Sequence, residues 1–82
     1  MRIQVEFDDD GVSLIECLKE KTGISTYKDL FNNALALLNW AVQQRESGRL
    51  IFSADESKKE YREMQMPALE HAARNRQRES AA

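Results

Sequence analysis

The stretch of sequence that decides the fold is residues 25–48, STYKDLFNNALALLNWAVQQRESG. On a helical projection its apolar side chains fall within an arc of about 160°, and its polar side chains fall opposite. That arc contains Leu30, Phe31, Ala34, Leu35, Leu37, Leu38, Ala41 and Val42. Thr26 and Asp29 have the spacing of a capping box, with Ser25 as a competing cap, and Ser47-Gly48 ends the segment. The pattern predicts a capped helix whose apolar face is wide for the few elements available to cover it.

A shorter helix is predicted just before this one, over residues 12–22. Its apolar side chains recur at helical spacing, with charged side chains between them. These apolar residues are Val12, Leu14, Ile15 and Leu18. The three aspartates at positions 8–10 stand where a cap and a favourable charge for the helix dipole belong. Gly23 is the natural left-handed end of this helix.

The N-terminal residues 2–7, RIQVEF, alternate between polar and apolar side chains. This period of two predicts a β-strand with one buried face. The apolar positions are Ile3, Val5 and Phe7, and the polar positions are Arg2, Gln4 and Glu6. A lone strand of this length is unstable because its backbone groups and its apolar face need a neighbour. Since the next segment is helical, the neighbour must come from later in the chain or from another chain.

Residues 49–82 have a different character. The apolar run of residues 50–52 is predicted to be extended, and residues 55–63, DESKKEYRE, allow two interpretations. The capping-box spacing of Ser53 and Glu56 favours a helix over residues 55–64. The alternative is a turn at residues 56–59 followed by a short strand through Tyr61, Met64 and Met66. Pro67 is predicted to break either element, and residues 68–78 predict a short helix with a frayed, arginine-containing tail.

Composition excludes several classes of protein. The chain has 82 residues, a formal net charge of −2 and one cysteine, which excludes a disulfide framework and a polybasic arm that dominates the chain. No apolar run approaches the length of a membrane span, and the N-terminus lacks an apolar signal core. We therefore expect a cytoplasmic protein that does not contact a membrane.

No enzymatic or metal-binding motif stands out. The sequence has no phosphate-cradling glycine motif and no nucleophile with a neighbouring base. Cys17, among apolar neighbours, is predicted to be a semi-buried structural thiol, and His71 lacks a second ligand nearby. The sequence predicts a protein that is not an enzyme, needs no cofactor and holds no metal.

Three segments together, RIQVEF, LIECLKEKTG and STYKDLFNNALALL, resemble the ribbon-helix-helix family of bacterial and phage DNA-binding proteins, which includes the Arc and Met repressors. The resemblance covers roughly residues 2–45. It implies a mainly α fold with a short N-terminal strand (β-α-α), in which two chains intertwine as a homodimer. Residues 1–47 would form the dimerisation and DNA-binding domain, and residues 48–82 a C-terminal extension. The implied dimer core consists of Ile3, Val5, Phe7, Leu30, Phe31, Ala34, Leu35 and Leu38.

The resemblance also implies a DNA-binding site. The paired strands of two chains would form a ribbon that fits the major groove, where Arg2, Gln4 and Glu6 would contact base edges. Thr26, Tyr27 and Lys28, at the start of the second helix, would contact phosphates. The implied function is sequence-specific binding of double-stranded DNA, as a transcriptional repressor.

Two other functions remain open. In an antitoxin, the N-terminal lobe would bind operator DNA while residues 49–82 bind a toxin. In an adaptor, the lobe would dimerise without binding DNA. Charge favours the adaptor, because residues 1–48 carry five basic and eight acidic side chains, whereas residues 49–82 carry seven and six.

Overall fold

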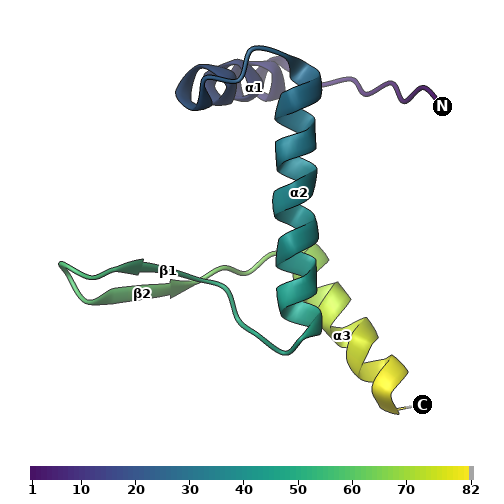
Figure 1. Cartoon of the computed structure of the whole chain (residues 1–82), viewed down its shortest axis with the longest axis vertical. Helices are drawn as coiled ribbons and strands as arrows, with labels where there is room; N and C mark the ends of the chain where they lie inside the picture. The colour runs from purple at the N-terminus through teal and green to yellow at the C-terminus, as the bar shows by residue number, and fades with distance from the viewer. Residues whose placement is uncertain (82) are drawn as a thin grey trace. The chain divides into compact units, whose positions relative to one another are not determined.

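The structure is a computed structural model that describes the backbone of residues 1–81 and the side chains of residues 1–76. Its elements are α1 (Asp9–Thr22), α2 (Tyr27–Glu46), β1 (Phe52–Asp55), β2 (Glu60–Glu63) and α3 (Pro67–Ala81) (Figure 1). The chain divides into two compact units, Met1–Ala34 and Leu35–Ala82, and α2 contributes to both. The predicted domain boundary at residues 47 and 48 coincides with the end of α2, whereas the division between the units falls inside this helix.

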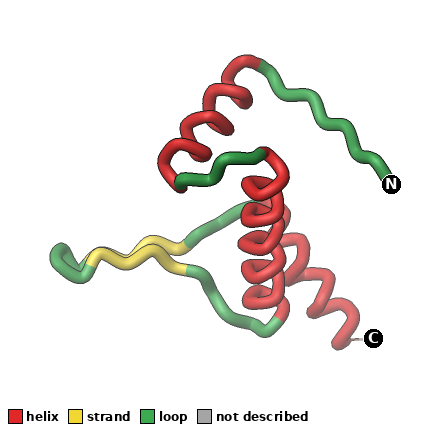
Figure 2. The backbone as a smooth tube through the Cα atoms, turned by 45° about the horizontal axis from the view of Figure 1, so that its top comes forward, coloured by secondary structure: helices red, strands yellow, loops and turns green. Residues whose placement is uncertain are grey.

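The predicted N-terminal strand is absent from the described chain, and the predicted β-α-α ribbon-helix-helix fold is therefore wrong. Residues 1–8 have no regular secondary structure and are drawn as loop in Figure 2. The element order is α-α-β-β-α. The physical reason is that a strand forms only by hydrogen bonding to a neighbour. The two strands among the described residues, β1 and β2, pair with each other and leave none for residues 2–7.

Local capping signals position α1 and the start of α2, as the sequence predicted. Asp8 Oδ1 accepts a hydrogen bond from the Gly11 amide at 2.8 Å, which caps α1. Gly23 ends α1 with φ 73°, a left-handed conformation that costs a residue with a side chain considerably more. Thr26 Oγ1 then accepts from the Asp29 amide at 3.1 Å and caps α2. Both helices therefore begin where a side chain accepts from a free backbone amide, and α1 ends where the Gly23 amide donates to the Glu20 carbonyl.

In the second unit, residues 52–63 form an antiparallel hairpin, so the predicted helix over residues 55–64 is wrong. The alternative interpretation is confirmed for the turn and for a strand at Tyr61, but β2 ends at Glu63 and does not reach Met64 or Met66. The side chain of Asp55 fixes the turn. Its Oδ1 accepts from the Ser57 amide at 3.1 Å, from the Ser57 hydroxyl at 2.7 Å and from the Lys58 amide at 3.4 Å. These bonds compete with helix formation and favour a turn.

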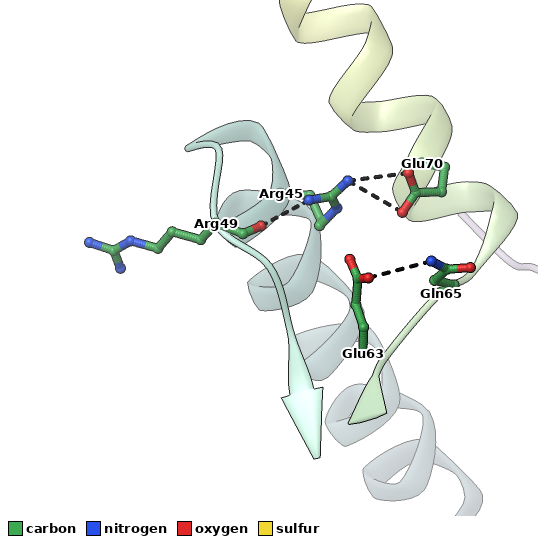
Figure 3. A network of polar contacts seen from close by, with 5 residues as sticks. All are labelled: Arg45, Arg49, Glu63, Gln65 and Glu70. Atoms are coloured by element: carbon green, nitrogen blue, oxygen red, sulfur yellow. Dashed lines mark hydrogen bonds and ion pairs between the residues drawn. The ribbon is translucent and has the colours of Figure 1, made fainter. Parts of the chain in front are cut away.

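Pro67 does not end an element; it is the first residue of α3, where its missing N–H costs nothing. An ion pair joins α3 to the end of α2. Arg45 Nη2 donates to both oxygens of Glu70, and Arg45 Nη1 donates to the Arg49 carbonyl at 3.1 Å (Figure 3). Among the side chains that the structure describes, Arg45 Nε is buried and finds no hydrogen-bond partner, which offsets part of this gain.

Very little apolar surface is buried within the described chain. The buried hydrophobic residues are Leu30 in the first unit and Ala41 and Leu69 in the second, which are 8%, 5% and 1% exposed. The chain exposes 7421 Å². Two separate compact bodies of the sizes of these units would together expose only about 6,000 Å². Most of the large apolar side chains that the structure describes are therefore exposed within the chain.

Candidate nucleic-acid interface

The residues predicted to contact bases lie on the N-terminal segment, residues 1–8. Arg2, Gln4 and Glu6 are all exposed there. The end of the segment is anchored on the first unit, because the Phe7 ring stacks on Phe31 with centroids 6.1 Å apart and an interplanar angle of 10°. A Cβ on Gly11 would come within 3.2 Å of Phe7 Cβ, so a glycine at this place lets Phe7 lie close to the first turn of α1. The stacked Phe7 ring thus fixes the end of the segment next to α1, and Arg2, Gln4 and Glu6 precede it in the sequence.

The apolar residues of the same segment border an apolar hollow in the first unit. Ile3 and Val5 are 73% and 63% exposed. Val5 and Phe7 form part of the wall of a hollow of about 240 Å³. Its lining residues are Val5, Phe7, Val12, Ile15, Glu16, Tyr27 and Phe31. The N-terminal segment therefore combines exposed polar side chains with apolar side chains that the first unit does not cover.

The predicted phosphate-contacting residues lie at the start of α2. Thr26 caps the helix, and its carbonyl accepts from the Leu30 amide at 3.1 Å. Because Thr26 Oγ1 serves as an acceptor in the cap, its hydroxyl proton remains a donor for an anion. Lys28 is exposed in the first turn. Asp29 is also in that turn and weakens the attraction of the helix end for a phosphate.

Tyr27 is already engaged within the first unit, an arrangement that sequence reasoning missed. Its hydroxyl donates a hydrogen bond to Glu16 Oε1 on α1. This bond, together with the charge of Glu16, raises the pKa of Tyr27 above its ordinary value. Lys19 Nζ lies 4.1 Å from the centroid of the Tyr27 ring and 4.0 Å from Glu16 Oε2. A phosphate contact by the Tyr27 hydroxyl would have to replace its bond to Glu16.

The Tyr27 arrangement left only a faint signal in the sequence. Glu16 and Lys19 stand three residues apart, a spacing at which helical side chains meet. Nothing in the sequence indicated that Tyr27, on the next helix, would reach the same place.

The residues of the predicted dimer core are mostly uncovered. Leu30 is buried, whereas the other predicted core residues are exposed within the described chain. The exposed ones are Ile3, Val5, Phe7, Phe31, Ala34, Leu35 and Leu38. Cys17 is exposed too, so the prediction of a semi-buried thiol is wrong.

The remaining charged residues are spread over several elements. Asp8, Asp9 and Asp10 serve the N-terminus of α1 as a cap and as favourable charges. Arg74 and Arg76 lie on α3, and the side chain of Arg78 lies outside the described residues. His71 Nε2 is 3.1 Å from Asn75 Nδ2. Within the described part of the chain, no group of three or more His, Cys, Asp or Glu side chains could hold a metal ion. In the same part, no helix is both long enough and apolar enough to cross a membrane.

No family model matches the sequence, and no curated protein or solved structure shows significant similarity to it.

Proposed function

We propose that this protein is a homodimeric, sequence-specific DNA-binding protein that acts as a transcriptional repressor. The observation that carries the proposal is the make-up of the N-terminal segment. Exposed Arg2 and Gln4 alternate with exposed Ile3 and Val5 on a segment anchored by Phe7. Alternating chemistry of this kind suits a segment with one side on an apolar surface and the other on a polar ligand.

The partner for the apolar side is a second copy of the chain. The first unit leaves an apolar hollow beside Val5 and Phe7, and most of the predicted core is exposed. A second copy brings the same uncovered side chains and would bury both sets at once. The two helices α1 and α2, with their caps, agree with the resemblance to DNA-binding proteins described above, whereas the missing N-terminal strand does not.

The polar side chains of the N-terminal segment are suited to bind the edges of DNA bases. Glutamine bonds in a bidentate manner to adenine and arginine to guanine in the major groove, so Gln4 and Arg2 supply sequence preference. Glu6 accepts from the amino group of cytosine or is repelled by phosphates. Thr26 and Lys28 add phosphate contacts, which set position and affinity but not sequence. Because two chains carry twice the charge of −2, affinity depends on where these few cations lie.

The proposal includes a cytoplasmic location, where a bacterial repressor meets DNA. The exposed carboxylates of Glu6 and Asp8–Asp10 favour one alternative, an adaptor module that dimerises without binding DNA. An antitoxin would use the same N-terminal contacts and add a toxin bound to residues 49–82.

Selection of bound sites from random duplex DNA with the full-length chain tests the proposal. We expect enrichment of a short, two-fold related motif. Gln4→Ala should lose the preference at one position of each half-site, whereas Lys28→Ala should weaken binding to all sequences alike and reduce its salt dependence. A stable dimer that enriches no motif would instead support the adaptor.

A further inference from the structure

The hairpin of the second unit has both its faces and its edges open to solvent. Every residue of β1 and β2 is exposed, and in both views the hairpin extends away from α2 and α3 (Figures 1 and 2). A two-stranded hairpin without a covering element is at best marginally stable. Phe52 and Tyr61, which share one face with Ala54, are 53% and 69% exposed. This hairpin is therefore a surface that lacks a partner within the described chain.

The register of the hairpin fixes which backbone groups point outward. The Met64 amide donates to the Ile51 carbonyl at 2.7 Å, which makes these two residues a hydrogen-bonded pair. Hydrogen-bonded and non-hydrogen-bonded pairs alternate along an antiparallel ladder. Phe52 and Glu63, the next pair, are therefore non-hydrogen-bonded, and so are Ala54 and Tyr61. On β2, the N–H and C=O groups of Tyr61 and Glu63 consequently point to the outer edge.

The charges of residues 59–63, Lys-Glu-Tyr-Arg-Glu, are complementary to themselves when the segment is reversed. If two such segments run antiparallel with Tyr61 opposite Tyr61, Glu60 of each chain faces Arg62 of the other. In the same register the turn residue Lys59, which has φ 53° and precedes β2, brings its charge near Glu63 of the other chain. The outward backbone groups of the two Tyr61 residues can bond to each other. Other registers lack this match: centring on Arg62 places two arginines opposite each other, which is destabilising.

The hairpin alone leaves one unfavourable contact that a second copy relieves. Within the chain, Asp55 lies directly opposite Glu60, so two carboxylates face each other across the strands. Like charges in this position destabilise a sheet. Self-pairing brings the Arg62 guanidinium of the second copy to the other side of Glu60.

We propose that the outer edge of β2 pairs antiparallel with the β2 edge of a second copy of this chain, centred on Tyr61. The product is a four-stranded sheet with order β1-β2-β2-β1. A two-fold axis perpendicular to the sheet keeps equivalent side chains on the same side, so Phe52, Ala54 and Tyr61 of both copies share one face, on which Glu63 also lies. This contact uses hairpin residues alone and does not depend on the proposed DNA binding.

Disulfide cross-linking tests the pairing in the full-length chain. Directly opposite residues in a hydrogen-bonded pair have Cα atoms about 5.5 Å apart, within the range of a disulfide. In a Cys17→Ser background, Tyr61→Cys should form a disulfide-linked dimer under mild oxidation much faster than Ala54→Cys. Ala54 is the matched control because it is exposed on the same face but lies on β1. Equal rates for the two variants, or a faster rate for Ala54→Cys, would overturn the proposal.

Charge reversal tests the register. In the Tyr61→Cys chain, adding Glu60→Arg or Arg62→Glu should each slow cross-linking by about tenfold, because both symmetric ion pairs become repulsive. Mixing these two chains should restore rapid formation of the mixed dimer, since each arginine then meets a glutamate. Glu60→Arg also removes the repulsion from Asp55 within the hairpin, so slower cross-linking cannot result from a weakened hairpin. Unchanged rates in both reversed chains would refute the register, whereas a cross-linking chain that selects no DNA would refute only the proposed function.

Discussion

Arg45 Nη2 lies 3.2 Å from one carboxylate oxygen of Glu70 and 3.3 Å from the other, so a single guanidinium nitrogen joins α2 to α3. The Arg45 side chain is largely buried, whereas that of Glu70 is partly exposed. Removal of the carboxylate leaves Arg45 donors without their acceptor. Glu70→Ala should therefore lower the free energy of unfolding by about 1–2 kcal/mol, as measured by urea denaturation with Trp40 fluorescence. Glu56→Ala, in the exposed hairpin turn, is the control, and equal effects of the two substitutions would contradict this assignment.

The magnitude of the Phe7→Ala effect distinguishes a monomer from a dimer. In the single chain Phe7 is partly exposed and stacks on Phe31, an interaction worth about 0.5–1.5 kcal/mol. If a second copy covers the ring, the loss should rise to about 3–5 kcal/mol. We expect the larger loss, with a stability that depends on protein concentration, in denaturation measured over a range of concentrations. The control Phe52→Ala, on the hairpin, should not lower the free energy of unfolding by as much. A small loss for Phe7→Ala at every protein concentration would show that no second copy covers the Phe7 ring.

The turn between α1 and α2 should tolerate asparagine better than alanine at position 23. Gly23 has φ 73°, and a Cβ there would meet no atom within 4 Å, so the cost of a side chain comes from the backbone conformation alone. Gly23→Ala should cost about 1–2 kcal/mol. Gly23→Asn should cost less, because asparagine adopts the left-handed conformation more readily. Thermal denaturation compares the stability of the two variants. An equal loss of stability for both would show that the left-handed backbone conformation at position 23 does not cause the loss.

The bond between Tyr27 and Glu16 predicts a dependence on alkaline pH. Because hydrogen bonding to Glu16 raises the pKa of Tyr27 above 10.0, the bond contributes fully below the ordinary pKa. Its contribution is lost as the pH rises through the folded-state pKa. In a Tyr61→Phe background, phenolate absorbance reports Tyr27 alone, and Glu16→Ala should lower its pKa towards 10.0. Glu20→Ala, on the same helix, should leave it unchanged, and the same pKa in both variants would rule out the coupling.

The carboxylate of Glu6 should oppose DNA binding. It lies on the same exposed segment as Arg2 and Gln4, so it would come into the negative potential of the phosphates if those residues contacted bases. Glu6→Gln should tighten binding to all duplexes by severalfold, most strongly at low salt, because screening weakens the repulsion as salt rises. Titration of labelled DNA at two salt concentrations measures this effect. Weaker binding by Glu6→Gln, confined to one base position, would instead make Glu6 a partner of cytosine.

The parts of the fold that could be predicted from sequence are those that neighbouring residues fix. Asp8, Gly23 and Thr26 mark helix ends because each interacts with backbone groups within a few positions. The strand predicted for residues 2–7 depended on a hydrogen-bonded neighbour, which no local pattern supplies. The helix predicted for residues 55–64 failed for a similar reason. The hairpin depends on Met64 reaching Ile51, a pairing that is distant in sequence.

The candidate site was predictable only in its composition. The alternation of Arg2 and Gln4 with apolar residues was visible in the sequence, as was the cap at Thr26. The engagement of Tyr27 by Glu16 was not, because it joins two helices whose relative rotation depends on packing. The exposure of Cys17 was missed for the same reason, since an apolar pattern does not reveal whether anything covers it.

The open outer edge of β1 has a consequence for handling the protein. Between Leu50 and Ala54 the chain carries no charged side chain, whereas β2 alternates charges that restrict its choice of partner. Pairing through β2 leaves β1 at both margins of the sheet, with the backbone groups of Phe52 and Ala54 still outward. An uncharged strand at an open margin is where irreversible aggregation begins in concentrated solutions. A lysine placed at Ala54, which lies opposite the uncharged Tyr61, should extend the storage life of the purified protein while leaving the pairing of β2 intact.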